Sequence, residues 1–156
     1  MKKNNNKGFT LVELIVVLVI LAILAAILVP ALLGYIDRAR EKQVTTNAEA
    51  ALVAAQGKMA DAYKTFDAPK NHVTKSQIDY LTDIDAAEKS GWSATYTATA
   101  YTSKATATRG MYKITKFAYF SKSYGQTAIW SSNTGQWEVK NGDHLSEGGS
   151  IAVPES

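Results

Sequence analysis

The sequence predicts an α+β fold, in which a long N-terminal α-helix packs against a C-terminal antiparallel β-sheet of three to four strands. Up to about residue 66, apolar residues recur at steps of three and four, which is the period of a helix. From residue 93 they alternate with polar residues, which is the period of a strand. A length of 156 residues, with 46% hydrophobic and 20% charged residues, is typical of one folded domain.

The predicted helix begins in an almost wholly apolar segment. From Phe9 to Val29 every side chain is aliphatic or aromatic except those of Thr10 and Glu13. As a helix these 21 residues span about 32 Å, against about 30 Å for the hydrocarbon core of a bilayer. Three lysines lie within residues 1–8, and positive residues tend to stay in the cytoplasm. We therefore expect one membrane span with a cytoplasmic N-terminus and the remaining chain outside.

Two other interpretations of this segment leave its carboxylate unexplained. A cleavable signal peptide usually has an apolar region of about 7–15 residues, shorter than this one, although Val29-Pro30-Ala31 could mimic its cleavage site. A plain single-pass anchor is the second alternative. Neither explains Glu13, because a carboxylate inside a membrane span costs about 2.5–3.5 kcal/mol. Such a carboxylate needs a partner, and the segment itself supplies no cation.

The start of the chain resembles the processing signal of type IV pilins and related pseudopilins. The residues that carry the resemblance are Lys7-Gly8-Phe9-Thr10-Leu11-Val12-Glu13, followed by the apolar helix to Pro30. The resemblance implies that a membrane-embedded prepilin peptidase cuts after Gly8 and N-methylates the new terminus on Phe9. Glu13 matches the glutamate at the fifth mature position of the family. Cleavage would create a cationic terminus that can pair with Glu13 of a neighbouring subunit, so we expect both residues to act in assembly.

Pro30 is the third residue for which we expect a role in assembly. It lacks an N–H group and crowds the carbonyl of Ala26, so a helix passing through it should kink or loosen locally. Related pilins match this proline and often have a glycine eight residues earlier, where this chain has Ala22. A static kink and a functional stretch zone both remain open.

We divide the chain into a cleaved leader (1–8), a transmembrane and filament-core helix (9–33) and a globular head (34–156). Within the head we expect a helix over 34–66, a connecting region over 67–92, a sheet over 93–140 and a tail over 141–156. The buried stripe of the head helix is expected to comprise Val44, Ala48, Ala51, Leu52, Ala55, Met59, Ala62 and Tyr63. Asp67-Ala68-Pro69 should end this helix. Thr74 to Gln77 fits a capping box that opens a short helix, with Ile78 and Leu81 on one side.

Alternation of apolar residues predicts the strands. Ala94, Tyr96, Ala98 and Ala100 should share one face of the first strand, and Tyr112, Ile114, Ala118 and Phe120 one face of the second, after a turn at Arg109-Gly110. Residues 127–131 and 136–140 should form two more, joined by a hairpin turn over 132–135. Trp130 and Trp137 are expected in the core or on the sheet face, with an adhesive aromatic patch as the alternative. The tail is either loose or folds across a sheet edge, in place of the cysteine pair that many Gram-negative pilins have there.

We expect no enzyme activity, no catalytic residue, no cofactor and no metal. The chain has no cysteine, no P-loop, no nucleophile elbow and no zinc-ligand set. Asp143, His144 and Glu147 are expected to be solvated, and His72 indicates no site. The remaining acidic residues, Asp79, Asp83, Asp85 and Glu88, are expected to form a solvated face. The net charge of +3 resides in residues 1–8, so we expect no sequence-specific nucleic-acid binding.

The resemblance implies a structural subunit, a pilin, that polymerises through its N-terminal helix into a filament for adhesion, motility or DNA uptake. The alternative is a pseudopilin of a type II secretion or competence machine, whose leader and helix would look the same. The expected partners are other copies in a helical filament, prepilin peptidase, the membrane and, indirectly, the inner-platform protein and the assembly ATPase. The protein should be single-pass in the membrane before assembly and extracellular on a pilus afterwards.

Overall fold

A computed structural model describes residues 8–65, 73–84, 88, 91–98, 112–149 and 151–153. The chain divides into two compact units, Met1–Ala39 and Arg40–Ser156. Several predicted features lie outside the described residues. These are residues 1–7 of the leader, the helix stop at Asp67-Ala68-Pro69, the turn at Arg109-Gly110, the side chains of Ala62 and Tyr63, and His72, Asp85 and Ala100.

The long helix α1 comprises Leu11–Thr65 and is unbroken across Pro30. The missing N–H group of Pro30 removes one helical hydrogen bond, that to the carbonyl of Ala26. This single defect does not end the helix, because the hydrogen bonds on both sides of it hold the backbone in helical geometry. The expected local loosening is therefore not seen at this position.

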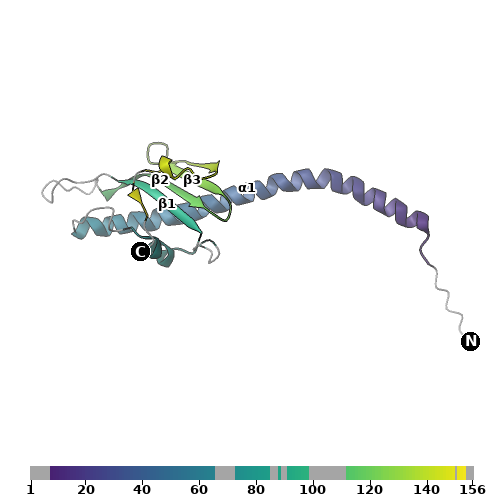
Figure 1. Cartoon of the computed structure of the whole chain (residues 1–156), viewed down its shortest axis with the longest axis horizontal. Helices are drawn as coiled ribbons and strands as arrows, with labels where there is room; N and C mark the ends of the chain where they lie inside the picture. The colour runs from purple at the N-terminus through teal and green to yellow at the C-terminus, as the bar shows by residue number, and fades with distance from the viewer. Residues whose placement is uncertain are drawn as a thin grey trace, which may run out of the picture. The chain divides into compact units, whose positions relative to one another are not determined.

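The sheet contains five antiparallel strands in the order β4-β3-β2-β1-β5 (Figure 1). The strands are β1 (Trp92–Ala98), β2 (Ile114–Ser121), β3 (Gln126–Ser131), β4 (Trp137–Asn141) and β5 (Ile151–Ala152). Three to four strands were predicted, and the fifth comes from the tail, over 141–156. The predicted α+β fold, a long helix packed on an antiparallel sheet, is confirmed.

The core of the Arg40–Ser156 unit lies between α1 and one face of the sheet. The residues of α1 that are fully buried there are Val44, Ala48, Ala51, Ala55 and Met59, all from the predicted stripe. Small alanine side chains let the helix approach the sheet closely, and the large rings come from the strands. Tyr96, Phe117 and Tyr119 are fully buried and belong to the same cluster. Trp130 and Trp137 are partly buried against it, as expected for core aromatics.

The predicted face of β2 is wrong in its second half. The register with β1 shifts between Thr97 and Ala98, which pair with Lys116 and Ile114, so β2 contains one extra residue there. A bulge of this kind reverses the alternation of side chains beyond it. Phe117 and Tyr119 therefore join Ile114 in the cluster under α1. Ala118 and Phe120, which the simple period of two placed with Ile114, lie on the opposite face.

The short helix α2 (Lys75–Leu81) begins with the predicted capping box. The amide of Gln77 donates to Thr74 Oγ1 at 3.4 Å, and the amide of Thr74 donates to Gln77 Oε1 at 3.3 Å. Ile78 is fully buried as expected, but Leu81 is 51% exposed. The helix is only seven residues long and turns its last residue away from the core.

The tail folds over the sheet, which is the second of the two predicted alternatives. β5 pairs with β1, and a 3₁₀ turn over Leu145–Glu147 precedes it. Thr95 Oγ1 donates to the carbonyl of Leu145, Thr97 Oγ1 to that of Gly148 at 3.2 Å, and Thr127 Oγ1 to that of Gly142 at 2.6 Å. The threonines of the sheet face opposite α1 thus bind the backbone of the tail. We call residues 142–152 the tail clasp.

Removal of residues 1–34 should leave a soluble, folded monomer. The deleted part is exposed along its length, whereas the described core belongs entirely to the Arg40–Ser156 unit. Circular dichroism should show mixed helix and strand with a cooperative thermal transition. An aggregated or unstructured product would contradict this prediction, since it would mean that the head cannot bury its core alone.

Candidate processing and assembly site

The predicted cleavage junction precedes the first turn of α1. Gly8, Phe9 and Thr10 lie outside regular secondary structure, and the helix begins at Leu11. Phe9 is 85% exposed, and no atom outside its chain neighbours lies within 4 Å of the position that a Cβ on Gly8 would occupy. A peptidase needs an extended, accessible peptide bond, and the bond between Gly8 and Phe9 meets this requirement.

Glu13 closes a capping box with Thr10. Thr10 donates to Glu13 Oε2 from its backbone amide at 3.1 Å and from its hydroxyl at 2.9 Å. The amide of Glu13 lies 3.3 Å from Thr10 Oγ1, to which it donates. Two amides at the start of α1, which no helical carbonyl can reach, are thereby satisfied. The sequence argument missed this role, although Thr-x-x-Glu before an apolar run is the signature of a capping box.

The capping box changes the expectation for Glu13 in one respect. The carboxylate was expected to lack any partner within its own segment, yet Thr10 supplies two donors. Both donors are neutral, however, so they satisfy hydrogen bonds without balancing the charge. Between Phe9 and Val29 the sequence holds no lysine or arginine. The negative charge of Glu13 therefore still requires a cation from outside this segment if it is to be buried.

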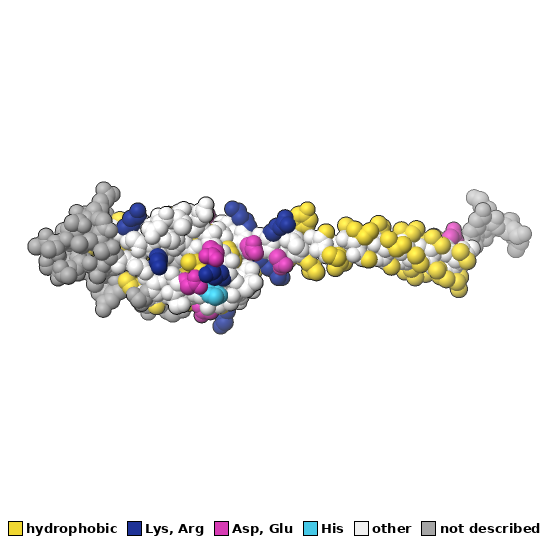
Figure 2. Space-filling view, turned by 90° about the horizontal axis from the view of Figure 1, so that it is seen from above, with side chains coloured by type: hydrophobic (Ala, Val, Ile, Leu, Met, Phe, Trp, Pro, Cys, Tyr) yellow, Lys and Arg dark blue, Asp and Glu magenta, His cyan; other side chains and the backbone are white. Residues whose placement is uncertain are grey.

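The N-terminal part of α1 is apolar around its whole circumference. Every large hydrophobic side chain from Leu11 to Leu33 is at least 49% exposed. Figure 2 shows these side chains as a continuous hydrophobic surface along the helix. In length and composition α1 can cross a membrane, and none of its apolar window is buried within the described chain. A helix that is hydrophobic on all sides is stable only in a membrane or among other helices.

The site residues do not all come together. Gly8, Phe9 and Glu13 gather at the start of α1, whereas Pro30 lies seventeen positions beyond Glu13, which is about 25 Å along the helix. Pro30 therefore has no contact with the processing junction of its own chain. Any influence of Pro30 on assembly has to act through the geometry of the helix.

The acidic residues of the head are not a solvated face, which corrects the sequence expectation. Asp79 Oδ1 accepts a hydrogen bond from Trp92 Nε1 at 2.8 Å. Glu88 is only 3% exposed, and its Oε1 accepts from the hydroxyl of Tyr119 at 3.3 Å. Burial and the neighbouring Glu88 carboxylate raise the pKa of Tyr119. These carboxylates link α2 and the connecting region to the sheet.

The polar residues of the tail clasp bind one another and are not simply solvated. Glu147 accepts from Lys140 Nζ at 2.6 Å and lies 3.0 Å from His144 Nδ1. The hydrogen bond from Lys140 holds the pKa of Glu147 below its ordinary value, and the same bond raises the pKa of Lys140. Asp143 Oδ1 accepts from the amide of Leu145 at 3.0 Å. Among the described residues, no three His, Cys, Asp or Glu side chains lie together as metal ligands.

Comparison with known protein families identifies the start of the chain. Residues 3–29 match the model of the prokaryotic N-terminal methylation motif. No curated protein and no solved structure matches the chain. The match includes Gly8, Phe9 and Glu13 and covers the apolar segment almost to its end. It confirms the leader that the sequence resemblance indicated, a substrate signal for prepilin peptidase on a membrane-associated protein.

Proposed function

We propose that this chain, which carries the class III leader of the type IV pilin family, is the structural subunit of a type IV pilus. In this role it is processed by prepilin peptidase and polymerised through α1 into an extracellular filament. The observation that carries the proposal is the fully exposed apolar half of α1 directly behind the processing junction. Such a helix suits two environments in turn, the bilayer before assembly and a bundle of neighbouring helices afterwards.

Glu13 gives the second environment its specificity. After cleavage, the new amino terminus of Phe9 is a cation only four positions from the carboxylate. In a bundle of apolar helices, each terminus can pair with Glu13 of the next subunit, and a charge pair in low dielectric is much stronger than in water. An unpaired charge there costs several kcal/mol, so correctly registered neighbours are favoured over misaligned ones. The inner-platform protein and the assembly ATPase would supply the machinery for this step.

We propose a structural and not an enzymatic role for the head. Among the described residues, its buried polar groups serve packing: Asp79 holds Trp92, Glu88 holds Tyr119 and the threonines hold the tail clasp. Antibody labelling of native cells tests the role in a pilus. Labelled fibres that extend from the cell surface are expected. Loss of secretion or DNA uptake on deletion, without labelled fibres, would instead identify a pseudopilin.

Cleavage after Gly8 should produce a mature chain of 148 residues that begins at Phe9. The exposed junction and the match to the methylation motif both favour this position. Intact-mass analysis of protein from native membranes or filaments should give the mass of residues 9–156 plus one methyl group. Deletion of the peptidase gene in the same cells should restore the full-length mass. A mature terminus near Ala31 would indicate ordinary signal peptidase and contradict the proposal.

A further inference from the structure

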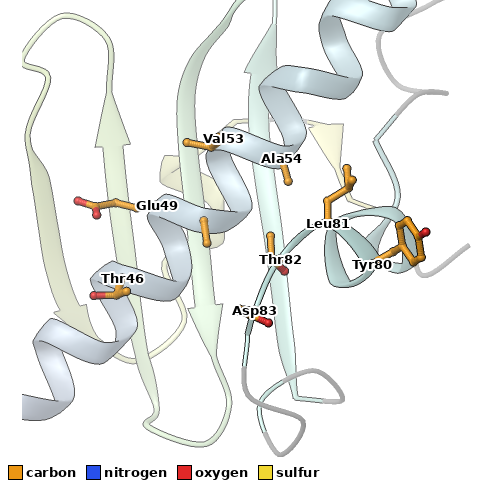
Figure 3. A pocket seen from close by; sticks show the side chains of 9 residues that line it. Thr46, Glu49, Val53, Ala54, Tyr80, Leu81, Thr82 and Asp83 are labelled. Atoms are coloured by element: carbon orange, nitrogen blue, oxygen red, sulfur yellow. The ribbon is translucent and has the colours of Figure 1, made fainter.

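A groove crosses the surface of the head where α1 runs beside α2. It has a volume of about 690 Å³ and is lined by Thr46, Glu49, Ala50, Val53, Ala54, Tyr80, Leu81, Thr82 and Asp83. Figure 3 shows the α1 side chains on one side and residues 80–83 on the other. Val53, Tyr80 and Leu81 are 72%, 90% and 51% exposed. Exposed apolar residues clustered in this way, with polar residues around them, mark an interaction surface.

The charge of the groove indicates what it binds. Both ionisable acidic side chains among its lining residues, Glu49 and Asp83, are negative at neutral pH, and no lysine, arginine or histidine lines it. A complementary surface would present an aromatic or apolar group together with cations. Charge complementarity of this kind selects partners and aligns them.

The same chain carries such a surface on α1. Tyr35, Arg38 and Lys42 are spaced at i, i+3 and i+7, so they share one face of the helix. The guanidinium carbon of Arg38 lies 5.9 Å from the centre of the Tyr35 ring. Tyr35 is 68% exposed, and both cations lie on exposed residues. We call these three residues the basic stripe.

The basic stripe cannot serve the acidic residues of its own helix. Lys42 and Glu49 are seven positions apart, which is about 10 Å along the helix axis and beyond the reach of an ion pair. Two different, complementary surfaces on one chain make a heterologous contact, and repetition of such a contact generates an open filament. A helix that lies in an apolar groove is also a common form of recognition.

We propose that the groove binds the basic stripe of a second copy of this chain. Tyr35 of the second copy covers the apolar part formed by Val53, Tyr80 and Leu81, and its Arg38 and Lys42 approach Glu49 and Asp83. This inference rests on the proposed function, since it assigns a contact between heads to the same filament. It differs from the pairing of Phe9 with Glu13, which concerns the apolar part of α1.

Cysteine cross-linking tests the contact directly, because the natural chain has no cysteine. Ala39→Cys, beside the basic stripe, and Thr82→Cys, in the groove, leave every charge in place. Whole cells that express the double variant should give disulfide-linked ladders of two or more subunits on mild oxidation. Each single variant should give none. The matched control is Ala39→Cys with Asn133→Cys, since Asn133 is exposed in the hairpin between β3 and β4, outside the groove.

Charge reversal gives an independent measurement. Arg38→Glu should raise the pool of unassembled subunits about tenfold, the factor that corresponds to about 1.4 kcal/mol. Adding Glu49→Arg and Asp83→Arg to the same chain should restore assembly. Normal fibres without ladders and without rescue would overturn the inference and leave the proposed function standing. Ladders without surface fibres would keep the contact and overturn the pilus. Cross-links to a different protein, or only within one chain, would also overturn the inference.

Discussion

Replacement of Glu13 by Gln should leave a processed, membrane-held monomer and almost no filaments. The substitution keeps the shape of the side chain and removes its charge. Glutamine is also a good residue at this position of a capping box, so the hydrogen bonds with Thr10 should survive. Insertion into the membrane should become easier, because an amide is cheaper to bury than a carboxylate. Cleavage should largely persist, since Glu13 lies beyond the scissile bond.

Assembly should fail because the charge on the neighbouring subunit is left unmatched. In the filament each Phe9 terminus would be buried as a cation without its carboxylate. Removal of one member of a buried pair costs about 3–5 kcal/mol, and this cost would recur at every subunit added. The processed fraction by immunoblot and the yield of sheared filaments, measured on the same cells, decide the outcome.

Two further variants separate the charge of Glu13 from its role as a cap. Glu13→Ala removes both the charge and the hydrogen bonds, whereas Thr10→Val removes the hydroxyl and keeps the charge. If the charge controls assembly, Thr10→Val should form filaments and both Glu13 variants should not. Abundant filaments from fully processed Glu13→Gln protein would refute the charge pair, and loss of filaments in Thr10→Val alone would assign the effect to capping.

Gly149→Ala should have the largest effect on the stability of the head. Gly149 has φ +141°, which L side chains rarely adopt, and an added Cβ would clash with the backbone carbon and oxygen of Tyr96. Strained backbone costs about 1–3 kcal/mol and overpacking about as much again. We therefore expect a loss of roughly 2–4 kcal/mol in the free energy of unfolding, measured by urea denaturation of residues 35–156.

Gly125→Ala is the matched control for this substitution. Gly125 also has positive φ, at +63°, but no neighbouring atom lies within 4 Å of the added Cβ. It should lose only about 1–2 kcal/mol, the cost of the left-handed conformation. Deletion of residues 144–156 sets the upper limit for Gly149→Ala, because the clasp can detach to relieve the clash. Equal stability of the two alanine variants would show that the tail clasp does not approach β1 closely.

Local sequence determined the class of this protein and the residues of its processing site. The leader, the apolar segment and the spacing of Gly8, Phe9 and Glu13 are properties of neighbouring residues, and so are the helical period and the capping box at Thr74. The capping role of Glu13 was equally local, since Thr10 lies three positions before it. It was missed because attention to the charge of Glu13 displaced the simpler hydrogen-bonding role.

The features that only the tertiary structure decided depend on contacts between distant parts of the chain. The bulge in β2 moved Phe117 into the core and Ala118 out of it, and a register of this kind exists only once β1 is paired. Thr95 binds Leu145 across fifty positions, so no window of sequence could show whether the tail was loose or bound. Leader and helix follow from backbone propensity and from the period of burial, which act within a few residues. Strand register, the tail clasp and the groove follow from pairing and packing, which no local period encodes.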